Sequence, residues 1–180
     1  VIPTAEEDYA DEPESPYGGA KKRLNELIKI MTKDSNLKYS ILNLSNVYGP
    51  RQDPNGEAGV ISIFANKYLN NEKPIIYGDG EQTRDYIYVK DVISALVKAS
   101  KIDENHFLNI GTGQEKSVND LANSMKIQFN SGIEPTYKPA REGELKRSVL
   151  NNAKAKQDLD WEPVYSLDDG MEAVFNWLKS

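Results

Sequence analysis

Short runs of β-branched and aromatic residues alternate with longer segments of helical periodicity, and this alternation restricts the fold more than any other feature. The strand-like runs cover 39–44, 74–77, 86–89, 107–110 and 135–138. The helix-like segments begin near positions 16, 60, 91, 117, 151 and 167. Strands and helices that alternate along a chain predict an α/β architecture.

Local signals mark where several of these elements begin. Ser15 is a good N-cap residue and Pro16 suits the first helical position, while Asp91 can cap the helix after the strand at 86–89. Ser117 and Asp120 have the spacing of a capping box. The sequence Gly111-Thr112-Gly113 follows a strand, but position 116 is lysine rather than the third glycine of a dinucleotide fingerprint. We therefore expect a plain strand-to-helix turn there.

Composition excludes several classes of function. The chain has 180 residues, which fits one domain or a domain with part of another. Its net charge of −6 argues against a main role in binding nucleic acid or an anionic membrane. With no cysteine there is no disulfide, thiolate metal site or thiol nucleophile. No apolar run is long enough to span a bilayer and no signal peptide is evident, so we expect a cytoplasmic protein.

Further expectations concern particular residues and segments. The single histidine, His106, is expected at the surface rather than as a ligand or base, and no metal site is expected. Residues 4–14 are acidic and are expected to form a solvated connection, and 53–56 has turn chemistry. Trp161 and Trp177 are expected to pack in the core.

Tyr17 and Lys21 stand four residues apart at the start of the first expected helix, so they share one helix face. A cation beside a phenol favours the phenolate, which makes the phenolic proton easier to transfer. The spacing alone fits an ordinary pair of surface side chains more often than a catalytic pair. A second Tyr-x-x-x-Lys at Tyr86 and Lys90 begins in an extended run, where such a pair cannot cooperate.

Five motifs in a fixed order resemble the C-terminal part of the NAD-dependent epimerase/dehydratase family of extended short-chain dehydrogenases/reductases, most closely the UDP-glucose 4-epimerases. They cover almost the whole chain. The motifs are Ser15-Pro16-Tyr17-Gly18-x-x-Lys21, Asn46-Val47-Tyr48-Gly49-Pro50-Arg51-Gln52, the run from Tyr77 to Val92, Asn109-Ile110-Gly111-Thr112-Gly113 and Arg141-Glu142-Gly143-Glu144.

The resemblance implies a 4-epimerase that oxidises a UDP-sugar transiently at C4 with NAD and then returns the hydride to the opposite face. In the family the tyrosine exchanges a proton with the C4 hydroxyl, so Tyr17 is implied as the acid/base. Lys21 is implied to hold the nicotinamide ribose. Ser45 replaces an aromatic residue near the nicotinamide. The parent protein is implied to be a homodimer.

The resemblance also implies a set of substrate residues. Asn46 matches the asparagine that contacts the nucleotide sugar, and Arg84 and Arg141 match the arginines that clamp the diphosphate, which suits the guanidinium fork. Tyr77 matches the aromatic residue on the base, and Glu144 a carboxylate at a ribose hydroxyl. Two further residues, Val60 and Ile61, fall in the segment that lines the nucleotide. Ser148 is small and would leave room for an N-acetyl group on the sugar. Without the motifs, Arg84 beside Asp85 also fits a surface ion pair, and Tyr77 also fits strand packing.

Three motifs of the family are missing from this sequence. It has no Gly-x-x-Gly-x-x-Gly turn after a first strand, no following acidic residue for the adenosine ribose, and no upstream serine or threonine of the catalytic trio. We therefore expect residues 1–58 to be the end of a Rossmann-like dinucleotide-binding domain. Residues 59–180 are expected to form mainly the substrate domain, with a segment near 82–112 returning to the first. The chain alone is expected to be inactive. A 4,6-dehydratase and a non-catalytic sugar-nucleotide-binding relative remain alternatives.

Overall fold

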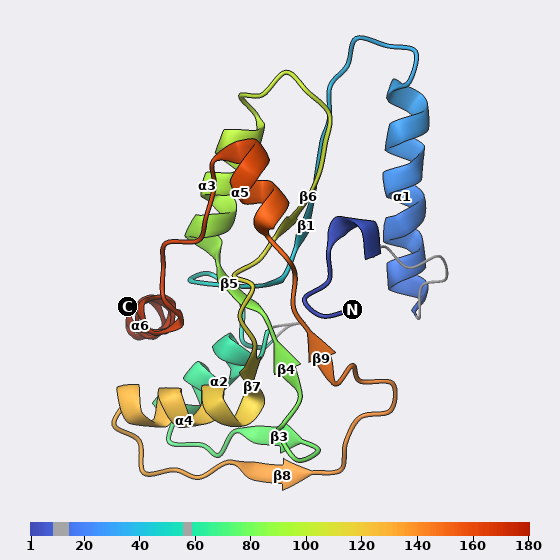
Figure 1. The fold of residues 1–180 in the computed structure, drawn as a ribbon. Coiled ribbons are helices and arrows are strands. Elements are labelled where there is room, and N and C mark those ends of the chain that lie inside the picture. The colour runs from blue at the N-terminus through green and yellow to red at the C-terminus, as the bar shows by residue number, and fades with distance from the viewer. Residues whose placement is uncertain (9–14, 56–58) are drawn as a thin grey trace.

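The computed structural model describes residues 1–8, 15–55 and 59–180 and has the expected α/β architecture (Figure 1). The predicted connection at 9–14 and the last residue of the predicted turn, Gly56, lie outside the described residues. The helices are η1 (Glu6–Asp8), α1 (Pro16–Thr32), α2 (Val60–Leu69), α3 (Val89–Ala99), α4 (Val118–Gln128), α5 (Ala153–Leu159) and α6 (Leu167–Lys179). The strands are β1 (Ser40–Leu44), β2 (Asn46–Tyr48), β3 (Ile75–Tyr77), β4 (Thr83–Arg84), β5 (Tyr86–Tyr88), β6 (His106–Ile110), β7 (Lys116–Ser117), β8 (Thr136–Lys138) and β9 (Arg147–Ser148).

Short parallel pairs form most of the sheet structure. Strand β1 pairs with β6, β2 with β5, and β3 with β8, all in parallel. Strand β4 lies between β7, which is antiparallel to it, and β9, which is parallel. Parallel strands cannot be joined by a tight turn, and helix α2 lies in the long connection between the paired strands β2 and β5.

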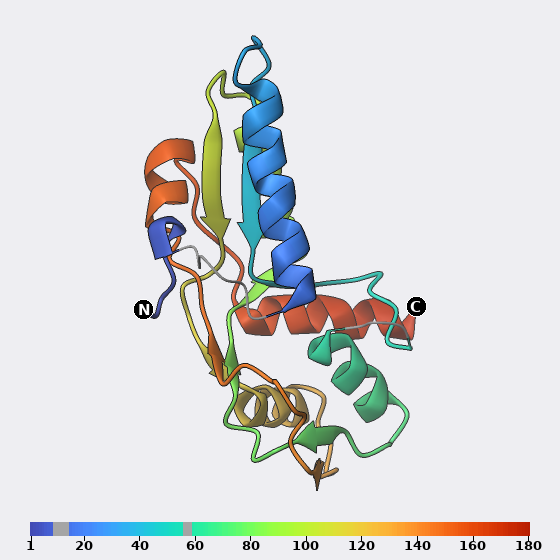
Figure 2. The same ribbon diagram turned by 90° about the vertical axis from the view of Figure 1, so that its right-hand side faces the viewer.

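The described residues form two hydrophobic cores. In Figures 1 and 2, helix α5 of the first core lies in the upper half of the ribbon, and helices α2 and α4 of the second lie in the lower half. The first, here the β6–α3–α5 core, is built around strand β6 and helices α3 and α5, with Trp161 at 2% exposure. The second, the α2–α4–α6 core, lies where these three helices meet strands β3 and β5. The buried residues of the β6–α3–α5 core begin at Ile87, and the earlier residues Leu42 and Val47 pack against them. The α2–α4–α6 core combines residues from Tyr48 to Val174.

Several predicted helix starts are confirmed. The Ser15 hydroxyl accepts the Gly18 N–H at 3.1 Å at the start of α1. Ser117 and Asp120 form a complete capping box on α4. The prediction for Asp91 is wrong, because α3 begins at Val89 with Tyr88 as its N-cap. Asp91 is buried in the first turn instead, where its carboxylate accepts the N–H groups of Val164 and Tyr165.

The exposure predicted for His106 is wrong, and the solvation predicted for residues 4–14 is wrong at two positions. His106 is only 6% exposed, because strand β6 places it against helix α5, with its Nδ1 3.7 Å from a carboxylate oxygen of Asp158. Within the predicted connection at 4–14, Glu7 and Asp8 are exposed as expected. Thr4 and Glu6 are bound instead: the Thr4 N–H donates to the Val149 carbonyl and the Glu6 carboxylate accepts the Asn109 N–H at 2.7 Å.

The burial of the two tryptophans and of the first helix agrees only partly with the prediction. Trp161 is buried as expected, whereas Trp177 is only partly buried. Helix α1 has the predicted apolar face, but Leu24, Leu27 and Met31 on it are about half or more exposed. None of the helices in the described ranges is both long and apolar enough to cross a bilayer.

Candidate functional site

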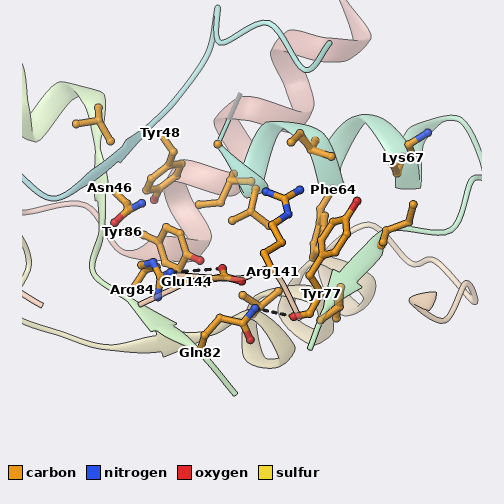
Figure 3. A pocket seen from close by; sticks show the side chains of 18 residues that line it. Asn46, Tyr48, Phe64, Lys67, Tyr77, Gln82, Arg84, Tyr86, Arg141 and Glu144 are labelled. Carbon is orange, nitrogen blue, oxygen red and sulfur yellow. Dashed lines mark hydrogen bonds and ion pairs between the residues drawn. The ribbon is translucent and has the colours of Figure 1, made fainter. Parts of the chain in front are cut away.

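A cavity of about 450 Å³ lies beside helix α2, and strands β2 to β5 contribute to its wall. This volume is within the usual range for small-molecule sites. The cavity lining includes seven residues that the sequence analysis assigned to substrate binding: Asn46, Val60, Ile61, Tyr77, Arg84, Arg141 and Glu144. Figure 3 shows Asn46 and Arg84 near one end and Lys67 near the other. Residues far apart in sequence are thus brought to one site, although their roles stay predictions.

Four predicted site residues are not among the described residues that line this cavity: Tyr17, Lys21, Ser45 and Ser148. Ser148 on β9 is paired with Arg84 on β4. It therefore lies next to a residue of the cavity wall, but it is not itself part of the lining. Conversely, Phe64, Lys67, Gln82 and Tyr86 line the cavity and were missed. Gln82 and Tyr86 belong to the motif from Tyr77 to Val92 and lie within two positions of Arg84, which was the signal available for finding them.

Arg84 is a mostly buried cation facing a carboxylate. Its side chain is 17% exposed, its Nη1 donates to the Thr83 carbonyl at 2.8 Å, and its Nη2 lies 3.4 Å from a Glu144 oxygen. The alternative of a surface ion pair between Arg84 and Asp85 is wrong. The Asp85 carboxylate is buried and accepts the Thr112 hydroxyl instead. A permanently charged guanidinium held in a cavity wall is suited to binding a diphosphate.

Tyr77 and Arg141 lie against each other in the cavity. The guanidinium carbon of Arg141 is 4.1 Å from the centroid of the Tyr77 ring, a cation–π contact (Figure 3). Gln82 Nε2 donates to the Tyr77 carbonyl at 2.8 Å and fixes the end of strand β3. Tyr77 thus lines the cavity, and Arg141 covers one side of its ring.

Asp85 holds together the backbone that carries the site. It is 1% exposed, and its carboxylate accepts the Thr112 N–H at 2.9 Å, the Thr112 hydroxyl at 2.6 Å and the Gly113 N–H at 3.2 Å. Its own carbonyl accepts the Asn46 N–H at 2.9 Å. Gly111 is required here, because a Cβ at that position would lie 2.4 Å from an Asp85 carboxylate oxygen. Asp85 thus fixes Arg84 and Tyr86, its neighbours on either side.

Glu115 braces the sheet of β7, β4 and β9 from its edge. Arg147 donates to its two oxygens from Nε at 2.9 Å and Nη2 at 2.5 Å, and the Thr83 hydroxyl donates at 2.6 Å. These hydrogen bonds, those from Arg147 first, lower the pKa of Glu115 to about 2. The brace lies at the surface of this sheet, and neither Glu115 nor Arg147 lines the cavity.

We expect Arg147→Gln to return the pKa of Glu115 toward its ordinary value of 4.5, because the charged donor is lost. The folded-state pKa lies below that of the unfolded chain, so the brace stabilises fully above pH 4.5 and is lost as the pH falls toward 2. A ¹³C NMR titration of the glutamate carboxyls measures this. A Glu115 pKa unchanged by the substitution contradicts the assignment of its cause.

Tyr17 and Lys21 lie side by side on α1, as their spacing predicts. The Lys21 Nζ is 5.4 Å from the centroid of the Tyr17 ring, and the ring is 73% exposed. The second Tyr-x-x-x-Lys behaves differently: Tyr86 is buried in β5, and Lys90 lies over Tyr165 instead.

Ser45 lies between β1 and β2, with its N–H donating to the Ile110 carbonyl. Its hydroxyl is buried and has no hydrogen-bond partner among the described residues. An unsatisfied hydroxyl next to Asn46, together with an exposed tyrosine–lysine pair, fits the nicotinamide end of a dinucleotide. The residues present are therefore compatible with that part of NAD.

Comparison with known proteins identifies relatives over almost the whole chain. The family model described as GDP-mannose 4,6 dehydratase matches residues 2–174. The UDP-glucose 4-epimerase of Mycolicibacterium smegmatis is 36% identical and is matched over 100% of this chain and 58% of its own length.

Two solved structures share the fold. The Thermotoga maritima UDP-glucose 4-epimerase with UDP-glucose is 42% identical, with a TM-score of 0.95 over 99% of this chain and 58% of that one. The Thermus thermophilus UDP-glucose 4-epimerase in complex with NAD is 32% identical, with a TM-score of 0.84 over 94% of this chain and 55% of that one. The chain thus spans little more than half the length of these relatives.

Proposed function

The chain belongs to the NAD-dependent epimerase/dehydratase family, and we propose that it is the C-terminal part of a UDP-sugar 4-epimerase of the UDP-glucose/UDP-galactose type. The identity to two UDP-glucose 4-epimerases supports this reaction over the 4,6-dehydratase and the non-catalytic alternatives. A cytoplasmic location and a homodimeric parent protein are part of the same proposal.

The cavity beside α2 is the observation that carries the proposal. It combines two guanidinium groups, from Arg84 and Arg141, with an aromatic ring at Tyr77 and apolar side chains of α2. A nucleoside diphosphate has the matching groups, namely two phosphates and a planar base. Asn46 lies at the Arg84 end of the cavity and is assigned to the sugar (Figure 3).

The reaction assigns a role to Tyr17 and Lys21 on α1. Tyr17 Oη takes the proton of the C4 hydroxyl and later returns it, while the Lys21 ammonium stabilises the phenolate. NAD, when bound, supplies the acceptor for the C4 hydride and its return. Tyr17, Lys21 and Ser45 would contact the nicotinamide end of the cofactor. Residues 1–58 and the segment near 82–112 are assigned to the cofactor side, and the remainder to the substrate side.

Calorimetric titration of the 180-residue chain with UDP tests the site. We expect one UDP bound per chain, with affinity falling in the order UDP, UMP, uridine, because each phosphate lost removes charge facing Arg84 and Arg141. Binding of uridine as tightly as UDP, or no binding of UDP at all, contradicts the proposed site.

The catalytic part of the proposal has its own measurement. With UDP-glucose and NAD, we expect the 180-residue chain to give no UDP-galactose, since it contains no Gly-x-x-Gly-x-x-Gly turn. The full-length parent protein should interconvert the two sugars, and Tyr17→Phe in it should abolish the conversion. Formation of a dehydrated 4-keto-6-deoxy sugar by the parent would instead favour the dehydratase alternative.

A further inference from the structure

The Tyr86 hydroxyl is a buried polar group that the fold leaves unsatisfied. The residue is 8% exposed, at the first position of strand β5, and its Oη has no hydrogen-bond partner among the described residues. Buried hydroxyls in folded proteins are almost always hydrogen-bonded, so one without a partner in a cavity wall indicates a place for a ligand.

The position of Tyr86 in the cavity wall shows which way its hydroxyl faces. The ring forms part of two cavities: the one beside α2, and a second of about 380 Å³ that Lys116 and Asp168 help to line. Arg84 and Glu144, which form an ion pair, line only the first of these cavities. Figure 3 shows Tyr86 between Asn46 and the Arg84–Glu144 pair, with its oxygen directed into the cavity beside α2.

We propose that Tyr86 Oη donates a hydrogen bond to a diphosphate oxygen of the bound nucleotide, beside the contact made by Arg84. This inference rests on the proposed function of the cavity. The hydroxyl lies at the arginine end of the cavity, away from the end marked by Lys67, which favours the diphosphate over the base as its partner (Figure 3).

The chemistry of the phenol suits a donor to an anion. Burial raises the pKa of Tyr86 to about 12, an effect that Arg84 partly offsets. The group therefore keeps its proton over the whole physiological range and has one O–H to donate. A hydrogen bond to a charged acceptor is stronger than one to a neutral acceptor, so the bond should contribute measurably to affinity.

Tyr86→Phe tests the proposal in the 180-residue chain, with UDP and uridine as probes. We expect about a tenfold loss in UDP affinity, the typical effect of one hydrogen bond to a charged group, and no change for uridine. The variant should melt at the same temperature as the wild type or a higher one, because it removes an unsatisfied buried hydroxyl.

Tyr68→Phe is the matched control. Its hydroxyl is buried too, but it donates to the Ala122 carbonyl and the residue does not line the cavity. We expect that variant to melt lower and to bind UDP normally. UDP binding by Tyr86→Phe as tight as the wild type, or an equal loss for uridine, overturns the inference and leaves the proposed function standing. Absence of UDP binding by the wild-type chain overturns the proposed function and this inference with it.

Discussion

Replacement of Arg84 by methionine is expected to weaken UDP binding by about 100-fold, from the loss of charge-assisted hydrogen bonds in a mostly buried site. The side chain is 17% exposed, so its charge is poorly screened by water. The substitution also leaves the Glu144 carboxylate without its partner and facing an anionic ligand. Calorimetric titration with UDP measures the loss, and circular dichroism checks that the fold is retained.

Two further variants make this result specific. Arg84→Lys keeps the charge but not the planar fork, and we expect an intermediate loss of about tenfold. Arg147→Met removes an arginine of the neighbouring strand β9 that pairs with Glu115 and does not line the cavity. We expect its UDP affinity to match the wild type. Equal losses in Arg84→Met and Arg147→Met would mean that net charge, rather than a site, governs binding.

The helix starts show what local sequence determines. The Ser15 cap and the Ser117–Asp120 capping box were predictable because each involves hydrogen bonds that span only three residues. Strands β4, β7 and β9 contain two residues each, which is too short for any alternation of apolar and polar positions. Their pairing depends on contacts such as Arg147 with Glu115, which are 32 positions apart.

The errors and omissions have a common physical cause. Asp91 has the residue type of a cap, yet its carboxylate is bound by backbone more than 70 positions away. His106 follows the polar run 103–105 in sequence and is buried because α5 packs on β6. Tyr86 lies within a recognised motif, but only the fold shows that its hydroxyl is buried without a partner in the described chain. Long-range packing decides each case, and no local pattern encodes it.

The largest effect on stability is expected from Asp85→Ala, with a fall of about 3–5 kcal/mol in the free energy of unfolding. The substitution removes one carboxylate and leaves four donors without their acceptor: the Thr112 N–H, the Thr112 hydroxyl, the Gly113 N–H and the Leu150 N–H. Each such donor costs about 1–3 kcal/mol when it is buried, and water reaching the partly buried loop offsets some of the sum. Urea denaturation followed by circular dichroism measures the difference.

Asp85→Asn separates the loss of shape from the loss of charge. The amide has nearly the size of the carboxylate, but one of its two polar atoms is a donor that faces the N–H groups of the 112–113 turn. We therefore expect a loss smaller than that of Asp85→Ala but still well above the approximately 0.5 kcal/mol typical of surface changes. Asp34→Ala, at an exposed position after α1, provides that surface reference. If Asp85→Asn were as stable as the reference, the carboxylate would not be holding the turn, and the fixed positions of Arg84 and Tyr86 would need another cause.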